Sequence, residues 1–189
     1  MKKGERDYDF LERILKDDNV VMAINNNMEK IEFYIPEIKH MKNFNQKDPE
    51  QHLDLWNHTL LSLYNSENDI DVRLALLLHD IGKPFSYQEG KTRKYHEHEK
   101  ISSLLAKKIL ERLGYSEQKI KTITFLIKNH DKRIDEKLIL ENTPLAIKLY
   151  QVQSSNISAH NPKKIEDQEK YLVRIKQRIK IEETRLYYF

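Results

Sequence analysis

The chain has 189 residues, with 33 lysines and arginines against 30 aspartates and glutamates, so its formal net charge is +3. That length suits one globular domain with a sizeable core, and the near balance of charges excludes the basic domain typical of duplex-binding proteins. Cysteine is absent, which excludes disulfides and thiolate metal sites.

Helical periodicity dominates from the N-terminus onward, and strand patterns of period two are nearly absent. A first helix is predicted over residues 5–17, and the stretch up to residue 51 is helical only in patches, with 39–51 as the longest irregular connection. The stronger helical patterns cover residues 53–66, 70–80, 97–113, 117–130 and 143–158. With only 4 glycines and 5 prolines, the pattern predicts an all-α fold.

Two other segments differ from these helices. The polar stretch SYQEGKTRKY, residues 86–95, is predicted as a loop that forms a lid or a short hairpin. After Pro162 the composition changes to a charged helix with one narrow apolar stripe at heptad-like spacing, which we interpret as a helix packed on the domain. A dimer-forming helix is the alternative, and a nucleic-acid arm is a lesser one. We therefore predict an N-terminal helical extension (1–29), a central domain (30–162) and a C-terminal amphipathic helix (163–189).

No apolar run approaches the roughly 18 residues that a membrane span needs. The first four residues are also not followed by the apolar stretch of a signal peptide. We expect a cytoplasmic protein without a membrane partner.

Several polar side chains stand where buried apolar residues are expected. His58, His130 and Asn156 each continue the apolar row of a helix, and His79 and Asp80 end the run LLLHD. Buried separately, each ionised group would cost several kcal/mol. A shared cation offsets that cost, and imidazole nitrogens with a carboxylate oxygen suit a divalent transition metal. The alternative is a polar cluster held by hydrogen bonds alone.

The motifs that carry these residues are WNHTLLSLY, LALLLHDIGKP, YHEHEKIS, IKNHDKR and YQVQSSNISAHNP. Their order and spacing resemble the HD superfamily of metal-dependent phosphohydrolases, and in particular the HD domain of bacterial tRNA nucleotidyltransferases. The resemblance covers roughly residues 30–162 and implies a helical HD bundle, here with an additional C-terminal helix. The nucleotidyltransferase head has no counterpart, so the resemblance implies a freestanding HD domain and makes nucleotide addition an unexpected activity.

The resemblance also implies a ligand set. His58, His79 and Asp80 match the first three metal ligands of the family, and the fourth, an Asp, is replaced here by Asn156. An asparagine can still offer its Oδ1, but the site loses one negative charge, which weakens its hold on a divalent ion.

Members of the family with two metal ions use two more histidines, for which His98 and His130 are the positional matches. The expected cofactor is Mn, Fe, Ni, Co or Zn, with one ion expected and two as the alternative. The identity of the metal does not follow from the residues.

The family's activity assigns roles to further residues. Asp80 and Lys83 are the predicted catalytic residues, with metal-bound water as the nucleophile. Lys83, Arg93, Lys94 and His52 are predicted to bind substrate, since phosphoryl transfer needs cations around the non-bridging oxygens.

The implied function is a phosphohydrolase acting on a phosphomonoester or cyclic phosphodiester of a nucleotide or RNA end. A catalytically attenuated HD module that binds a nucleotide or protein partner is the alternative, because of Asn156. Asp131 is predicted either to orient a neighbouring imidazole or to cap a chain reversal. His160 is interpreted as helix-end structure and His40 as a surface residue.

Overall fold

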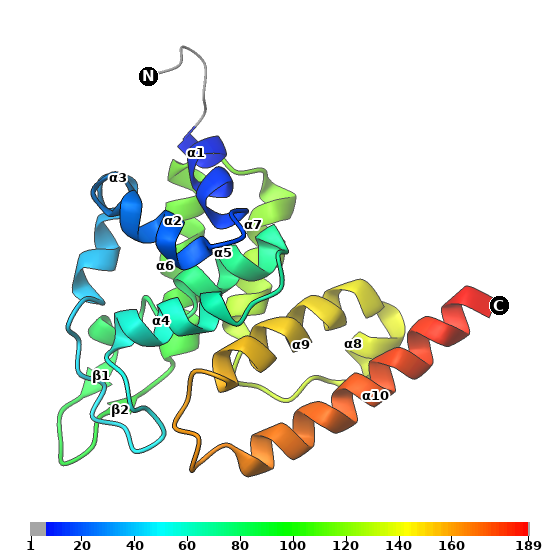
Figure 1. The fold of residues 1–189 in the computed structure, drawn as a ribbon. Coiled ribbons are helices and arrows are strands. Elements are labelled where there is room, and N and C mark those ends of the chain that lie inside the picture. The colour runs from blue at the N-terminus through cyan, green and yellow to red at the C-terminus, as the bar shows by residue number, and fades with distance from the viewer. Residues whose placement is uncertain (1–6, 189) are drawn as a thin grey trace.

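A computed structural model describes residues 7–188 and has an almost entirely helical architecture, so the predicted all-α class is confirmed (Figure 1). In chain order the elements are α1 (Asp7–Leu15), α2 (Val20–Asn26), α3 (Met28–Tyr34), the 3-10 helix η1 (Pro36–His40), α4 (Leu55–Tyr64), α5 (Ile70–Leu78), the 3-10 helix η2 (Lys83–Phe85), β1 (Tyr87–Gln88), β2 (Lys94–Tyr95), α6 (His98–Arg112), α7 (Glu117–Lys128), α8 (Glu136–Glu141), α9 (Thr143–Ile157) and α10 (Glu166–Tyr188). The two short strands pair antiparallel, so the polar loop forms a hairpin.

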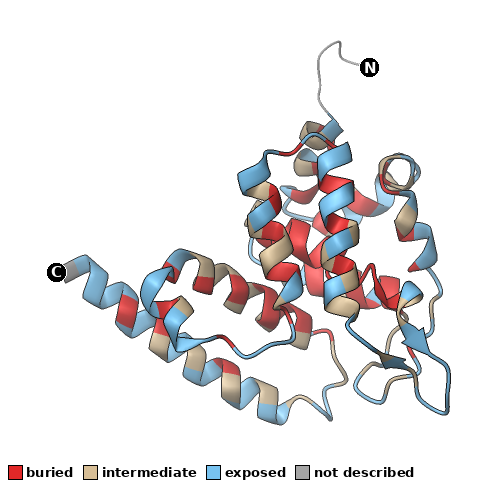
Figure 2. Cartoon of the chain, turned by 180° about the vertical axis from the view of Figure 1, so that it is seen from behind, coloured by how far each residue is buried: buried red, intermediate tan, exposed pale blue. Residues whose placement is uncertain are grey.

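Helix α5 lies at the centre of the bundle and packs against α4, α7 and α9. Every residue of its run Leu74–Leu78 is fully buried, and Figure 2 shows buried residues gathered in the middle of the bundle. A helix that is apolar on all sides belongs inside a protein, which explains the run of leucines before His79. The run therefore places the His79-Asp80 pair deep in the molecule.

The helices that carry the predicted ligands end slightly earlier than their patterns predict. Helix α5 ends at Leu78 and α7 ends at Lys128, so His79 and His130 lie just beyond them. In each case the imidazole Nδ1 contacts the carbonyl oxygen three residues earlier, at 2.7 Å from Leu76 and 2.6 Å from Ile127. A side chain that bonds a last-turn carbonyl competes with continuation of the helix.

Gly82 allows the turn after the His79-Asp80 pair to approach α6 closely. A Cβ atom at this position would lie 2.6 Å from the backbone nitrogen of Ser102, and the Gly82 N–H donates to Ser102 Oγ at 2.9 Å. Only glycine fits without displacing backbone. This contact fixes the start of α6, and with it His98, beside Asp80.

The C-terminal helix α10 packs along α9 and α8 (Figure 1). Leu172 and Ile179 of its apolar stripe are buried. Further along, Glu182 is also buried and pairs with Arg178 and Arg185. Across the described residues 7–188, none of the helices combines the length and the apolar character required to cross a membrane.

Candidate metal centre

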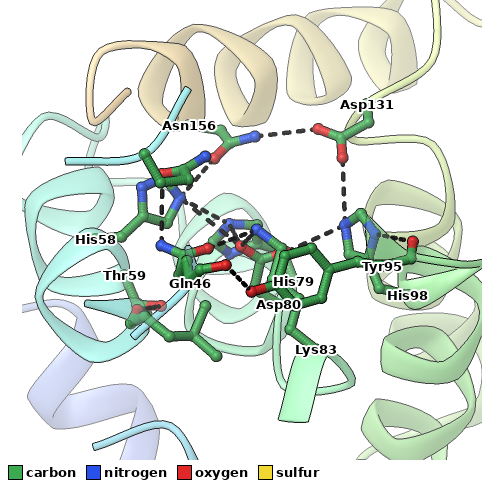
Figure 3. Close-up of polar contacts among 12 residues, drawn as sticks. Gln46, His58, Thr59, His79, Asp80, Lys83, Tyr95, His98, Asp131 and Asn156 are labelled. Carbon is green, nitrogen blue, oxygen red and sulfur yellow. Dashed lines mark hydrogen bonds and ion pairs between the residues drawn. The ribbon is translucent and has the colours of Figure 1, made fainter. Parts of the chain in front are cut away.

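Three helices and the turns that follow two others bring the predicted ligands together, with Asn156 on α9. His58 lies on α4, His79 and Asp80 follow α5, His98 begins α6, and His130 follows α7. His58 and His79 are fully buried, and Asp80 is 1% exposed. The close-up view shows the side chains of His58, His79, Asp80 and His98 pointing toward one another from different elements (Figure 3).

The four imidazoles use their two ring nitrogens in the same way. Each directs its Nδ1 at a backbone carbonyl oxygen and its Nε2 at the centre of the cluster. The Nδ1 contacts are 3.4 Å for His58 to Ala159, 2.7 Å for His79 to Leu76, 3.3 Å for His98 to Tyr95 and 2.6 Å for His130 to Ile127. An outer N–H held by a carbonyl leaves the inner nitrogen available to a cation, which is the usual arrangement of metal-binding histidines.

Asp80 divides the cluster into two sets of three residues. Its Oδ2 lies 3.2 Å from His79 Nε2 and 3.8 Å from His58 Nε2. Its Oδ1 lies 3.3 Å from His98 Nε2 and 3.6 Å from His130 Nε2. Within each set the ligand atoms lie within 4.8 Å of one another, so each set could hold an ion.

Asn156 joins the first set from α9. Its Oδ1 lies 2.9 Å from His58 Nε2, and its Nδ2 donates to Asp131 Oδ1 at 3.3 Å. The carboxylate beside Nδ2 fixes the orientation of the amide, because only the NH₂ group can donate to it. Asn156 therefore turns a neutral oxygen toward His58.

Lys83 is held beside the carboxylate of Asp80. Its Nζ lies 2.7 Å from Asp80 Oδ2 and donates to Gln46 Oε1 at 2.9 Å. Gln46 is itself buried in the long connection before α4. The ammonium is thus oriented by two oxygens at the edge of the cluster.

The charges in the cluster shift the pKa values of its members in opposite directions. Burial lowers the pKa of His58 to about 3, so this imidazole is neutral. Burial alone would lower the pKa values of His98 and His130, but Asp131 and Asp80 beside them raise those values to about 9 and about 10. Burial would raise the pKa of Asp80, but His79 and Lys83 hold it well below its usual range.

A cavity of about 750 Å³ opens beside the cluster, lined by Asp80, His98, His130 and Asn156 but not by the fully buried His58 and His79. Lys83, Arg93 and Lys94 all line it, although the guanidinium of Arg93 already pairs with Glu89 at 2.9 Å and donates to the carbonyl of Asn45. His52 does not reach this cavity and lines a separate hollow beside the long connection. The structure thus places three of the four predicted substrate-binding residues around the cluster and one apart from it.

Some residues near the cluster were not predicted as part of it. The His160 ring lies 5.4 Å from that of His58 and lines the cavity, although the sequence suggested only helix-end structure. Gln46 had no sequence signal at all, because it lies in an irregular connection. Lys132 and Arg133 also line the cavity, and their place after His130 in a basic stretch was the one available signal.

The donor set fits a divalent transition metal. Among the described residues, two buried cluster atoms, Asp80 Oδ1 and His98 Nε2, lack a hydrogen bond of acceptable geometry, even though they lie 3.3 Å apart. Unpartnered buried polar atoms are costly, and coordination to one cation would satisfy both. Imidazole nitrogens with carboxylate oxygens suit Mn, Fe, Co, Ni or Zn.

The family model of the HD domain matches residues 50–177, which is more than half of the chain. The chain therefore belongs to the HD domain family, which places it in a superfamily of metal-dependent phosphohydrolases. The predicted resemblance is confirmed.

Two curated relatives are tRNA nucleotidyltransferases. The chain is 27% identical over 113 residues to the CC-adding enzyme of Thermus thermophilus, covering 55% of this chain and 26% of the relative. It is 31% identical over 87 residues to the A-adding enzyme of Deinococcus radiodurans, covering 42% of this chain and 20% of the relative. The chain thus matches about a quarter or less of the length of these relatives.

Proposed function

We propose that the protein is a metal-dependent hydrolase of phosphate esters whose substrate is a phosphomonoester or cyclic phosphodiester of a nucleotide or an RNA end. One observation carries the proposal, namely the convergence of four imidazole Nε2 atoms and both Asp80 oxygens at the base of an open cavity. The relatives act on tRNA, as their names state, which supports a nucleotide or RNA substrate.

The ligands in this proposal are His58, His79, Asp80 and Asn156 for one ion. His98 and His130 share Asp80 for a second ion. A bound divalent ion supplies positive charge and lowers the pKa of water toward 7, which makes a nucleophile available at neutral pH.

The remaining chemistry belongs to side chains around the ligands. Lys83 Nζ faces the cavity beside Asp80 and offers its charge to the non-bridging oxygens of a phosphoryl group. Asp80 holds Lys83 in place as well as serving both sets of imidazoles. Lys94 lines the cavity from β2 and binds the rest of a polyanionic substrate.

The test combines metal analysis with an activity panel. Purified protein is assayed for bound metal, stripped with a chelator and supplied with Mn²⁺, Co²⁺ or Ni²⁺. Hydrolysis is then followed with p-nitrophenyl phosphate, bis-p-nitrophenyl phosphate and 2′,3′-cyclic nucleotides. We expect metal-dependent hydrolysis that Asp80→Asn lowers at least about 100-fold, because even the outer partners of metal ligands typically contribute 10- to 100-fold.

The matched control is His40→Gln, which changes a surface histidine whose ring packs on Phe85 and which is not among the residues that line the cavity. It should keep the activity. A protein that accepts no divalent ion and stays inactive across the panel would contradict the proposal. Metal binding without hydrolysis would instead favour an attenuated HD module that binds a nucleotide or protein partner, the alternative that the neutral Asn156 supports.

A further inference from the structure

The two candidate metal sets contain few negative charges for their number of ligands. Four imidazoles and the amide of Asn156 are neutral donors when they bind metal, and the two sets share the single carboxylate of Asp80. Two divalent ions would therefore bring four positive charges to one buried negative charge. Such an imbalance at low dielectric opposes binding of the second ion.

Asp131 lies where it could correct this imbalance. It directly follows His130, and its Oδ2 lies 3.2 Å from His130 Nε2 and 3.2 Å from His98 Nε2. These are the inner nitrogens of the second set. The carboxylate thus contacts the same two nitrogens as Asp80 Oδ1, and the close-up view shows Asp131 pointing toward His98 (Figure 3).

The other oxygen of Asp131 is held by α9. Asp131 Oδ1 accepts a hydrogen bond from Asn156 Nδ2 at 3.3 Å. An aspartate at position 156 would instead place two carboxylates within contact distance, and like charges that close repel. Asparagine at 156 and aspartate at 131 are therefore mutually compatible, which connects the unusual residue on α9 to the carboxylate after α7.

We infer that Asp131 is a metal ligand of the set formed by Asp80, His98 and His130, and that it supplies the second carboxylate of the centre. Asn156 holds Asp131 in position while its own Oδ1 serves the first set. The inference rests on the proposed metal binding. Asp131, 25 positions earlier in the chain, thus supplies the negative charge that an aspartate at position 156 would have supplied.

The test is a Co²⁺ titration of metal-free protein, followed by visible absorption, which reports both the number of bound ions and their coordination. Asp131→Ala removes the carboxylate, and Asp131→Asn removes its charge while keeping its shape. The side chain is 44% exposed, so both variants should fold, as circular dichroism of the metal-free proteins will verify. Glu99→Ala is the matched control, since Glu99 lies 3.6 Å from the outer nitrogen of His98.

We expect wild-type protein to bind two Co²⁺ ions. Asp131→Ala should weaken one of them by more than about 100-fold, beyond the 10- to 100-fold typical of partners that only orient a ligand. The spectrum of that ion should also change, because it loses a ligand. Asp131→Asn should weaken the same ion to a smaller extent. Glu99→Ala removes a carboxylate at the outer nitrogen of His98, so it should not exceed the 10- to 100-fold of such partners and should leave the spectrum unchanged.

Three results would overturn the inference. The first is that Asp131→Ala changes the Co²⁺ affinity by less than threefold, whether the wild-type protein binds one ion or two. The second is weaker binding with an unchanged spectrum, which means that Asp131 acts only through the imidazoles. The third is a wild-type protein that binds no Co²⁺, and this result also removes the proposed function, whereas the first two leave that function standing.

Discussion

Asp80 connects both halves of the centre because its two oxygens face different pairs of imidazoles. A fully buried carboxylate with an unpartnered oxygen is costly by itself. Here the cost is offset by His79 and Lys83, which hold the pKa of Asp80 well below its usual range, although burial opposes them. The charged form is thus stable at neutral pH and ready to receive a cation.

Lys83 should contribute to the reaction more than to metal binding. Lys83→Met removes the charge that faces a phosphoryl group and keeps the length of the side chain. We expect kcat/KM to fall by about 100-fold, which is comparable to the loss of one oxyanion-stabilising donor. Metal content, measured by elemental analysis, should stay the same.

The control for this prediction is Lys94→Met on β2. Lys94 lines the cavity but makes no ion pair with Asp80 among the contacts of residues 7–188. Its loss should raise KM with little effect on kcat. If Lys83→Met released the metal as well, Lys83 would be needed to assemble the centre rather than for catalysis.

At the scale of single elements, α5 determines where the centre lies. Asp69 caps its N-terminus by accepting hydrogen bonds from the N–H groups of Asp71 and Val72. The ammonium of Lys148 on α9 lies 2.5 Å from Asp69 and 3.1 Å from Asp71. This network joins α5 to α9, the two helices that deliver Asp80 and Asn156.

Acid should weaken this junction. Burial would raise the pKa of Asp69, but hydrogen bonds from Lys148 and the Val72 backbone lower it below its usual value. A depressed folded-state pKa contributes stability above the unfolded value of about 3.9, and this is lost as pH falls through the folded value. Asp69→Asn should therefore lower stability at pH 7 by up to about 1 kcal/mol, a difference that disappears as the pH falls through the lowered pKa of Asp69.

Urea unfolding of both proteins between pH 2.5 and 7 checks this expectation. Asp54→Asn is the control, because Asp54 caps α4 in the same way and has no Lys or Arg partner within the described part of the chain. It should change stability little at either end of the range. If Asp69→Asn lowered the stability by the same amount at every pH, the capping hydrogen bonds and not the charge of Asp69 would stabilise the protein at this position.

At the scale of the whole molecule, α10 completes one wall of the cavity. Asp167, Gln168 and Tyr171 line it from this helix. The Tyr171 hydroxyl accepts a hydrogen bond from the Ile134 N–H at 2.6 Å, and Arg133 lies 5.7 Å from the Tyr171 ring. The helix therefore supports the segment after α7, which carries His130 and Asp131.

Two neighbouring residues of α10 should differ in how much their substitution by alanine lowers the stability of the protein. Leu172 is 6% exposed and Val173 is 57% exposed. Leu172→Ala should destabilise the protein by about 2–3 kcal/mol because it leaves a cavity against the domain. Val173→Ala should stay within about 0.5 kcal/mol, as is usual for surface substitutions. Denaturant unfolding measures both.

Sedimentation of the same variants addresses the dimer alternative. Val173 and Ile181 are exposed on α10 and lie about 80° apart around the helix, so a dimer interface that includes them would make Val173→Ala lower the association constant. If the stability depended on protein concentration in the wild type but not in Val173→Ala, a dimer interface on α10 would be favoured. If the unfolding of both proteins were independent of concentration, α10 would pack only on the domain of its own chain.

The sequence by itself determined the helical class, the central buried helix and the chemical character of the centre. A run of leucines that ends in His79-Asp80 predicts burial, and the cost of burying histidines with a carboxylate pointed to a shared cation, with a hydrogen-bonded polar cluster as the alternative. The motif order was sufficient for the HD family, and Asn156 was visible as a departure from its pattern. Periodicity along one helix carries this information because it depends on the local chain alone.

Only the tertiary structure decided how these residues meet. It placed His160, Gln46 and Asp131 at the cluster and His52 apart from it. Periodicity shows which face of a helix is apolar, but not how two helices cross or how deep an irregular connection reaches. The contact between Asn156 and Asp131 joins α9 to the segment after α7. Such a contact results from the packing of helices, and the sequence pattern within either segment does not reveal it.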